Sequence, residues 1–365
     1  MNRYKERGIR MKKSLLLGAV ALFSVGILAG CKGDTDSKGE TEKSNKSEKI
    51  VVYSNSASDG RAEFLTELGK EEGFNLEVVS IGGTDLLNRV IAEKDAPIAD
   101  VIFGMNQMMF STIANEGILK EYEPSWLGEV DESLISDDHL FSPLQEQRVV
   151  MVYDKNKINE ADAVTSWEDL INNKEYAGKY MVPQTLGGAT QNAVTYTIMM
   201  NYLDEKGELG VSDKGWNEIE TFFANGVSPQ EGLSEIDELT NETVDYSYTW
   251  LSNIPVVEEN YGIELGVVNP SYGVPQTIEQ VGIISKDKMN KDVEAFVDFL
   301  GSAEVQAKWA EKFGTAPVNK EAQGSMNERV KEVLESTTPQ NNDYDFISEH
   351  MDEWVEFIEL NILGN

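Results

Sequence analysis

Between residues 50 and 103, apolar strand patterns alternate with amphipathic helix patterns, and this alternation is the strongest constraint on the fold. The strand patterns are residues 50–53, 76–81 and 101–103. Apolar residues at helical spacing mark the intervening helices: Phe64, Leu65 and Leu68, then Leu86, Leu87, Val90 and Ile91. Strands and helices that alternate at this spacing indicate βαβ units and a mostly parallel sheet.

Two further apolar strands, 148–154 and 277–284, lie far apart in the sequence, and we interpret them as crossings between two lobes. The segment between them predicts a helix that starts with a capping box at Ser166, a helix over 191–202, and strands at 245–250 and 263–268. Apolar residues at helical spacing near the end predict a helical tail: Phe346, Ile347, Met351, Trp354, Val355 and Ile358. The predicted class is α/β with two lobes and mixed, mostly parallel sheets.

The start of the chain has the pattern of an export signal. A basic segment precedes an apolar run that begins near Leu15, and this run is shorter than the ~20 residues that a membrane-spanning helix needs. The run ends in Leu28-Ala29-Gly30-Cys31, which resembles the lipobox of bacterial lipoprotein signal peptides. The resemblance implies that Cys31 is lipidated and anchors the protein to the outer face of the cytoplasmic membrane. Met1 and Met11 are alternative starts.

Composition removes several classes of function. The formal net charge of -33 argues against nucleic-acid partners, which require clustered basic residues. Cys31 is the single cysteine, so no intramolecular disulfide can form. His139 and His350 are the two histidines, which leaves little material for a His/Cys metal site or a Ser-His hydrolase. We therefore expect a protein that is not an enzyme, with no cofactor and no metal.

Three groups of segments resemble one known family in their order and spacing. They are Ala99-Asp100-Val101-Ile102-Phe103-Gly104; Ser166-Trp167-Glu168-Asp169-Leu170 with Tyr176-Ala177-Gly178-Lys179; and residues 290–300 followed by 302–306. The chain resembles extracellular solute-binding proteins of ABC importers, in the branch with receptors for ferric iron, thiamine, phosphonates and polyamines. The resemblance implies a monomeric two-lobed clamp of the type II periplasmic-binding class. A small solute lies in its cleft, and the membrane subunits of an ABC permease are its partners.

The predicted organisation combines the signal, the crossings and this resemblance. A polar segment that has no apolar side chain to bury follows Cys31 and predicts a disordered tether. The predicted parts are a signal peptide (1–30), the lipidated cysteine and tether (31–48), the first part of lobe 1 (49–150), lobe 2 (151–278), and the return of lobe 1 with the C-terminal helices (279–365).

Polar turns that follow the predicted strands supply the candidate ligand-binding residues. Open α/β sheets bind ligands at the carboxyl ends of their strands. From lobe 1 the candidates are Asn55, Ser56, Gly83, Thr84 and Asn106, and from lobe 2 they are Gly187, Gly188, Thr190, Tyr246, Tyr248 and Trp250. Glycine permits close backbone approach, and helix N-termini attract anions. The sequence therefore predicts a solute with a phosphonate, phosphate or carboxylate group.

Other ligands and other classes stay open. Ferric receptors of this branch use two neighbouring tyrosines, but here Ser247 separates Tyr246 from Tyr248. An i, i+2 pair on a strand still points to one face, so joint contact with iron is an alternative. A polyamine could pair with acids such as Asp59, Asp85 or Glu279. Outside transport, the alternatives are an exported hydrolase and a surface adhesin.

Overall fold

The computed structural model describes residues 47–364, which belong to one compact unit. The predictions for residues 1–46, including the signal peptide and the lipid on Cys31, lie outside the described residues. Within the described part, no helix combines the length and the apolar character needed to cross a bilayer.

A mixed sheet forms the first half of this unit. Its strand order is β10-β5-β9-β3-β1-β2, and β4 pairs with β9. The bounds are β1 Lys49–Ser54, β2 Asn75–Ser80, β3 Val101–Asn106, β4 Leu119–Lys120, β5 Ser142–Asp154, β9 Gln276–Ile284 and β10 Ala316–Pro317. The predicted α/β class is confirmed. The expectation of mostly parallel sheets is corrected: β1 runs parallel to β2 and β3, but the other ladders of this sheet are antiparallel, because β9 returns between β3 and β5.

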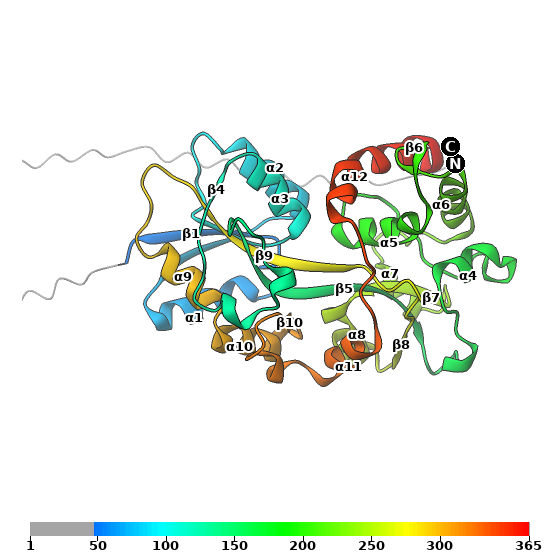
Figure 1. Cartoon of the computed structure of the whole chain (residues 1–365). Helices are drawn as coiled ribbons and strands as arrows, with labels where there is room; N and C mark the ends of the chain where they lie inside the picture. The colour runs from blue at the N-terminus through cyan, green and yellow to red at the C-terminus, as the bar shows by residue number, and fades with distance from the viewer. Residues whose placement is uncertain (1–46, 365) are drawn as a thin grey trace, which may run out of the picture. The chain divides into compact units, whose positions relative to one another are not determined.

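Helices cover both faces of this sheet. Successive strand residues point to opposite faces, so Val52 and Phe103 pack on one side while Tyr53 and Ile102 pack on the other. The helices on the first side are α1 Arg61–Glu72, α9 Val293–Leu300 and α10 Ala303–Phe313; those on the second are α2 Gly83–Ala92 and α3 Gln107–Asn115. Figure 1 shows the two sets above and below the strands.

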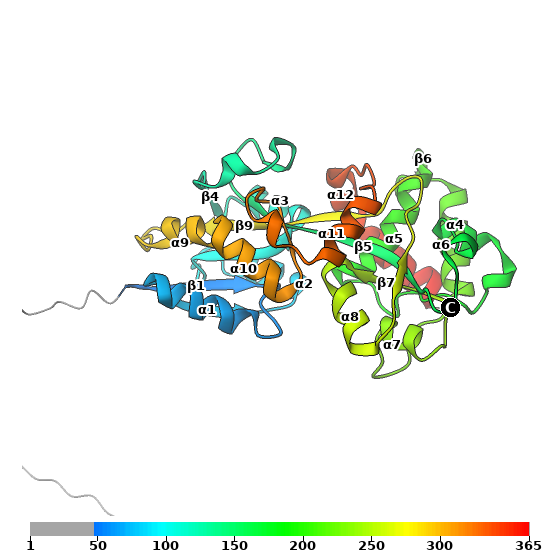
Figure 2. The same ribbon diagram turned by 90° about the horizontal axis from the view of Figure 1, so that it is seen from below.

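A separate hydrophobic cluster, called the second cluster because it belongs to the second half, includes residues 149–153 of β5. Figure 2 shows the helices that gather at this end of the strand. Here β5 pairs with β7 Tyr246–Trp250 and β8 Leu265–Val267. The helices of this region are α4 Trp167–Asn172, α5 Ala189–Met199, α6 Asp213–Asn225, α7 Glu235–Thr240, α8 Ile254–Tyr261 and α11 Glu328–Ser336, and β6 is Leu203–Glu208. The predicted capping box is present at the start of α4, where Ser166 and Asp169 cap each other.

Strand β5 belongs to both halves. Its first part pairs with β9, and its second part, from Val149 onward, pairs with β7. The strand predicted at 148–154 is therefore the second part of a longer strand. The strand predicted at 277–284 is confirmed as β9, which runs back beside the first part of β5.

The C-terminal helix α12, Tyr344–Ile358, is helical as predicted but packs elsewhere. Ile347, Trp354 and Ile358 are buried in the second cluster, and α12 lies beside α5 (Figure 1). The Trp354 indole N–H donates to the Leu209 carbonyl at 2.9 Å. We expected the whole of 279–365 to return to the first lobe, whereas α12 buries its apolar face against the second.

Candidate functional site

A cavity of about 660 Å³ lies between the two halves. The turn after β1, the end of β3, the strands β5 and β9, and α10 line it on one side. The start of α5, the end of β7 and α8 line it on the other. A volume of this size suits a small organic ligand.

Three strands form one wall of the cavity where their register is irregular. Glu279 of β9 pairs with Asn106 of β3 and with Gln145 of β5. Both ladders shift register next to this position, and such bulges redirect side chains near functional sites. All three residues line the cavity.

Gly104 keeps the neighbouring wall close-packed. Its φ of +98° is one that other residues rarely adopt, and a Cβ there would lie 2.7 Å from both Asn55 Oδ1 and Ser56 Oγ. The backbone of β3 therefore packs directly against the turn that follows β1.

Glu279 is the partly buried acid of this wall. Burial raises the pKa of its carboxyl to about 7, and hydrogen bonding with Ser56 and Gln147 and the charge of Arg61 only partly oppose that rise. It forms no ion pair with another described residue. Near neutral pH, proton loss at this carboxyl therefore depends on what lies beside it in the cavity.

The start of α5 faces the cavity from the opposite side. Its N-cap is Gly188, which has no side chain to cap the helix, and Ala189 and Thr190 of the first turn line the cavity. First-turn N–H groups have no partner within a helix, and the helix dipole gives them partial positive charge. An anionic group is thus favoured at this end of the cavity.

Five of the residues predicted from the sequence line the cavity: Asn55, Ser56, Asn106, Thr190 and Trp250. The Trp250 side chain is 44% exposed, which leaves its ring open to contact. Whether these residues bind ligand stays a prediction.

The two glycine-containing turns lie beside the cavity rather than on its wall. Gly83, Thr84, Gly187 and Gly188 are not among the lining residues. Instead, the Thr84 hydroxyl donates to the Gly187 carbonyl at 3.1 Å. This hydrogen bond joins the start of α2 to the loop before α5, so these turns connect the two halves.

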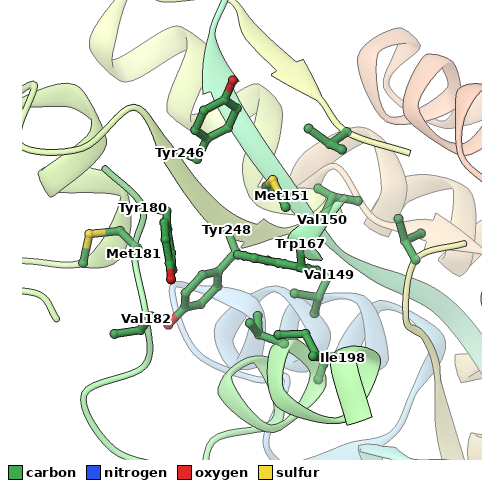
Figure 3. Packing of buried hydrophobic residues seen from close by; sticks show 14 of the residues in the cluster. Val149, Val150, Met151, Trp167, Tyr180, Met181, Val182, Ile198, Tyr246 and Tyr248 are labelled. Atoms are coloured by element: carbon green, nitrogen blue, oxygen red, sulfur yellow. The ribbon is translucent and has the colours of Figure 1, made fainter. Parts of the chain in front are cut away.

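Tyr246 and Tyr248 lie in the core of the second half, which corrects the expectation that they face the cleft. They are 1% and 2% exposed, and Figure 3 shows their phenol oxygens directed away from one another. The Tyr246 oxygen accepts from the Val164 N–H at 3.2 Å, and the Tyr248 hydroxyl donates to Glu235 Oε1 at 2.9 Å. Burial raises both pKa values. Residues 47–364 also contain no group of three His, Cys, Asp or Glu side chains able to hold a metal ion.

The sequence analysis missed several lining residues, notably Arg61, Gln145 and Gln147. Arg61 is the first residue of α1, and its guanidinium lies 4.7 Å from the centroid of the Phe313 ring. The two glutamines alternate along β5 and so share a face of the strand. Their i, i+2 spacing just before the apolar run of β5 is the sequence pattern that could have identified them as residues of one strand face.

Comparison with known proteins gives consistent similarities. The family described as bacterial extracellular solute-binding protein matches residues 63–332. A protein of Sinorhizobium fredii, "Probable ABC transporter periplasmic-binding protein y4fP", is 29% identical over 313 residues, covering 86% of each chain.

Solved structures share the fold at low sequence identity. Apo ferric ion-binding protein A of Pasteurella haemolytica has a TM-score of 0.71 at 17% identity, over 86% of this chain and 97% of that one. AfuA of Actinobacillus pleuropneumoniae, with fructose-6-phosphate bound, has a TM-score of 0.68 at 16% identity, over 86% and 98%. At this identity the likeness establishes the fold alone.

Proposed function

The chain belongs to the bacterial extracellular solute-binding protein family, and from this premise we propose that it binds a small solute with a phosphate or phosphonate group. It is a solute-binding protein of an ABC transporter and not an enzyme. The two halves act as the lobes of a clamp, and the cavity between them is the ligand site.

The uncapped start of α5 is the observation that carries this proposal. The first turn of α5 has no side-chain cap, its residues Ala189 and Thr190 line the cavity, and the Thr190 hydroxyl adds a donor. The Arg61 guanidinium lines the cavity from the other lobe. An oxyanion between them is favoured by both a helix dipole and a full positive charge.

The tyrosine geometry speaks against ferric iron as the solute. An iron-binding phenolate must be deprotonated and must reach the metal. Tyr246 and Tyr248 are buried away from the cavity, and their oxygens have separate protein partners. The case for a polyamine as solute is weaker as well, because Asp85, one of the acids predicted to bind it, is exposed and does not line the cavity.

Replacing both tyrosines, Tyr246→Phe with Tyr248→Phe, is therefore expected to leave solute affinity within about threefold of wild type. Each lost hydrogen bond is expected to lower the free energy of unfolding by about 1 kcal/mol. Calorimetric titration with ethyl phosphate, together with urea unfolding, measures the two effects separately. A tenfold loss of affinity in a folded double variant would return the tyrosines to the site.

The transport cycle follows from the two-sided cavity. A solute that contacts both lobes stabilises the closed state and shifts the equilibrium toward it. The Thr84–Gly187 hydrogen bond joins the lobes beside the cavity and favours the same state. We further propose that the protein is a monomer anchored by lipid on Cys31 and that the permease recognises the closed form.

A ligand screen tests the proposal directly. The purified protein in chelator-treated buffer is heated with ethyl phosphate, methylphosphonate, spermidine or ferric citrate. We expect dose-dependent stabilisation by the first two, about 2.7 kcal/mol at 100 times Kd, and none by the others. Stabilisation by ferric citrate or spermidine alone would overturn the assignment of an anionic solute.

A further inference from the structure

Glu279 is an acid on the cavity wall that forms no ion pair with another described residue. It sits between Asn106 and Gln145 on the irregular part of the sheet. The charge of Arg61 reaches Glu279 without an ion pair, while Nη1 lies 3.6 Å from Asp59 Oδ2 and the guanidinium lies over the Phe313 ring. A partly buried carboxylate is unfavourable unless a positive charge or hydrogen-bond donors accompany it.

Two other side-chain oxygens of residues that line the cavity lack a hydrogen-bond donor within residues 47–364. Gln147 Oε1 and Asn55 Oδ1 are buried and accept no hydrogen bond from any described residue. The Gln147 amide nitrogen already donates to Ser252 Oγ at 3.3 Å. Gln145 lines the cavity although it is only 4% exposed. A protonated amine offers three donors and a positive charge, which matches this shortage.

We propose that Glu279 binds a cationic group of the solute, so that the ligand is zwitterionic: an amine-bearing phosphate or phosphonate. Its anionic end lies at the start of α5, and its ammonium group lies against the wall formed by β3, β9 and β5. This inference rests on the proposed function, because the α5 end supplies the anion site. The other acids that line the cavity, Asp59, Glu259 and Glu311, are exposed and remain solvated.

The ionisation of Glu279 gives the inference a pH signature. Its pKa is about 7 because burial disfavours the charged form. Among the groups that act on it, Arg61 from α1 supplies a positive charge, and Ser56 and Gln147 supply hydrogen bonds. An ammonium group stabilises the ionised carboxylate, so binding below pH 7 must release a proton. The preference for an amine-bearing ligand therefore rises between pH 6 and pH 8.

Three phosphate monoesters test the inference in calorimetric titrations at pH 6, 7 and 8. They are O-phosphoethanolamine, ethyl phosphate without the amine, and glycerol 3-phosphate with hydroxyls in its place. The ammonium group of O-phosphoethanolamine lowers the second pKa of its own phosphate, so the affinity ratios are compared between wild type and Glu279→Gln at each pH, which isolates the contribution of the carboxylate. Wild type is expected to bind O-phosphoethanolamine more tightly than either other ester at pH 8, by on the order of 10- to 100-fold. This is the affinity that a charge-assisted hydrogen bond contributes.

Variants locate the effect. Glu279→Gln keeps the shape of the side chain and is expected to lose both the preference and its pH dependence while still binding ethyl phosphate. The matched control is Glu72, an exposed acid at the end of α1 that does not line the cavity, since Glu72→Gln should retain the preference.

Three outcomes overturn the inference while the proposed function stands: equal affinities in wild type, glycerol 3-phosphate bound as tightly as O-phosphoethanolamine, or a preference that survives in Glu279→Gln. Failure of all three esters to bind would instead remove the proposed function, and this inference with it.

Discussion

Replacing Thr190 with Asp is expected to weaken binding of a phosphate monoester by about two orders of magnitude. The new carboxylate would lie in the first turn of α5, on the cavity wall. Two unit charges about 5 Å apart repel by about 3 kcal/mol at an effective dielectric constant of 20, which corresponds to roughly 200-fold in affinity. The carboxylate also competes with the solute for the first-turn N–H groups.

The free energy of unfolding of Thr190→Asp, in contrast to its affinity, is expected to stay the same or to rise. An acid in the first turn of a helix interacts favourably with the helix dipole, by about 0.3 to 1 kcal/mol. Thr190→Asp should therefore unfold at the same or higher urea concentration than wild type while its titration with ethyl phosphate shows little heat. Thr190→Asn, similar in size but neutral, is the control and should lose much less affinity. If Thr190→Asp binds ethyl phosphate within threefold of wild type, the start of α5 is not the anion site.

Trp354→Ala is expected to produce the largest loss of stability, about 3 to 5 kcal/mol. The indole is 1% exposed, packs near the Phe346 ring with centroids 5.9 Å apart, and donates its N–H to the Leu209 carbonyl. Removing it leaves a cavity and deprives the partly buried Leu209 carbonyl of its donor. Urea unfolding followed by circular dichroism measures the change.

Two controls separate packing from a general effect on α12. Trp354→Phe retains most of the buried ring and should lose less than the alanine variant. Glu353 is the adjacent exposed residue, and Glu353→Ala should change the free energy of unfolding by no more than about 0.5 kcal/mol. A loss below 1.5 kcal/mol in Trp354→Ala would mean that α12 is not part of the second core.

The sequence predicted helices and strands well where the residues of a single segment determine the structure of that segment. The alternation of β1, α1, β2, α2 and β3 follows from periodicity, and the capping box at Ser166 follows from local hydrogen bonding. The position of β9 between β3 and β5 cannot be predicted from local patterns, because strand pairing is set by contacts between segments far apart in the sequence. That insertion changes most ladders of the sheet to antiparallel.

The candidate site was predictable in part, for the same reason. Asn55, Asn106 and Thr190 follow strands or open helices, so local position was enough to select them. The i, i+2 spacing of Tyr246 and Tyr248 does not reveal that both side chains are buried in the core, with their phenol oxygens directed away from one another (Figure 3). That depends on the helices that pack over β7.

The face of α12 illustrates the same limit. Its apolar stripe shows that the helix must bury one side, and Trp354 is part of that stripe. Nothing in the stripe distinguishes one lobe from the other, because both present apolar surfaces. The choice is made by contacts such as the hydrogen bond to Leu209.

Strand β5 belongs to both halves, and this affects how the protein is expected to unfold. Its 13 residues form a continuous strand that pairs with β9 in its first part and with β7 in its second. Unfolding of either half would therefore remove hydrogen-bond partners from a strand that also belongs to the other half. Because β9 lies beside the first part of β5, two separate passes of the chain would have to open together. We therefore expect the halves to unfold as one cooperative unit, with local opening confined to the elements outside these two strands.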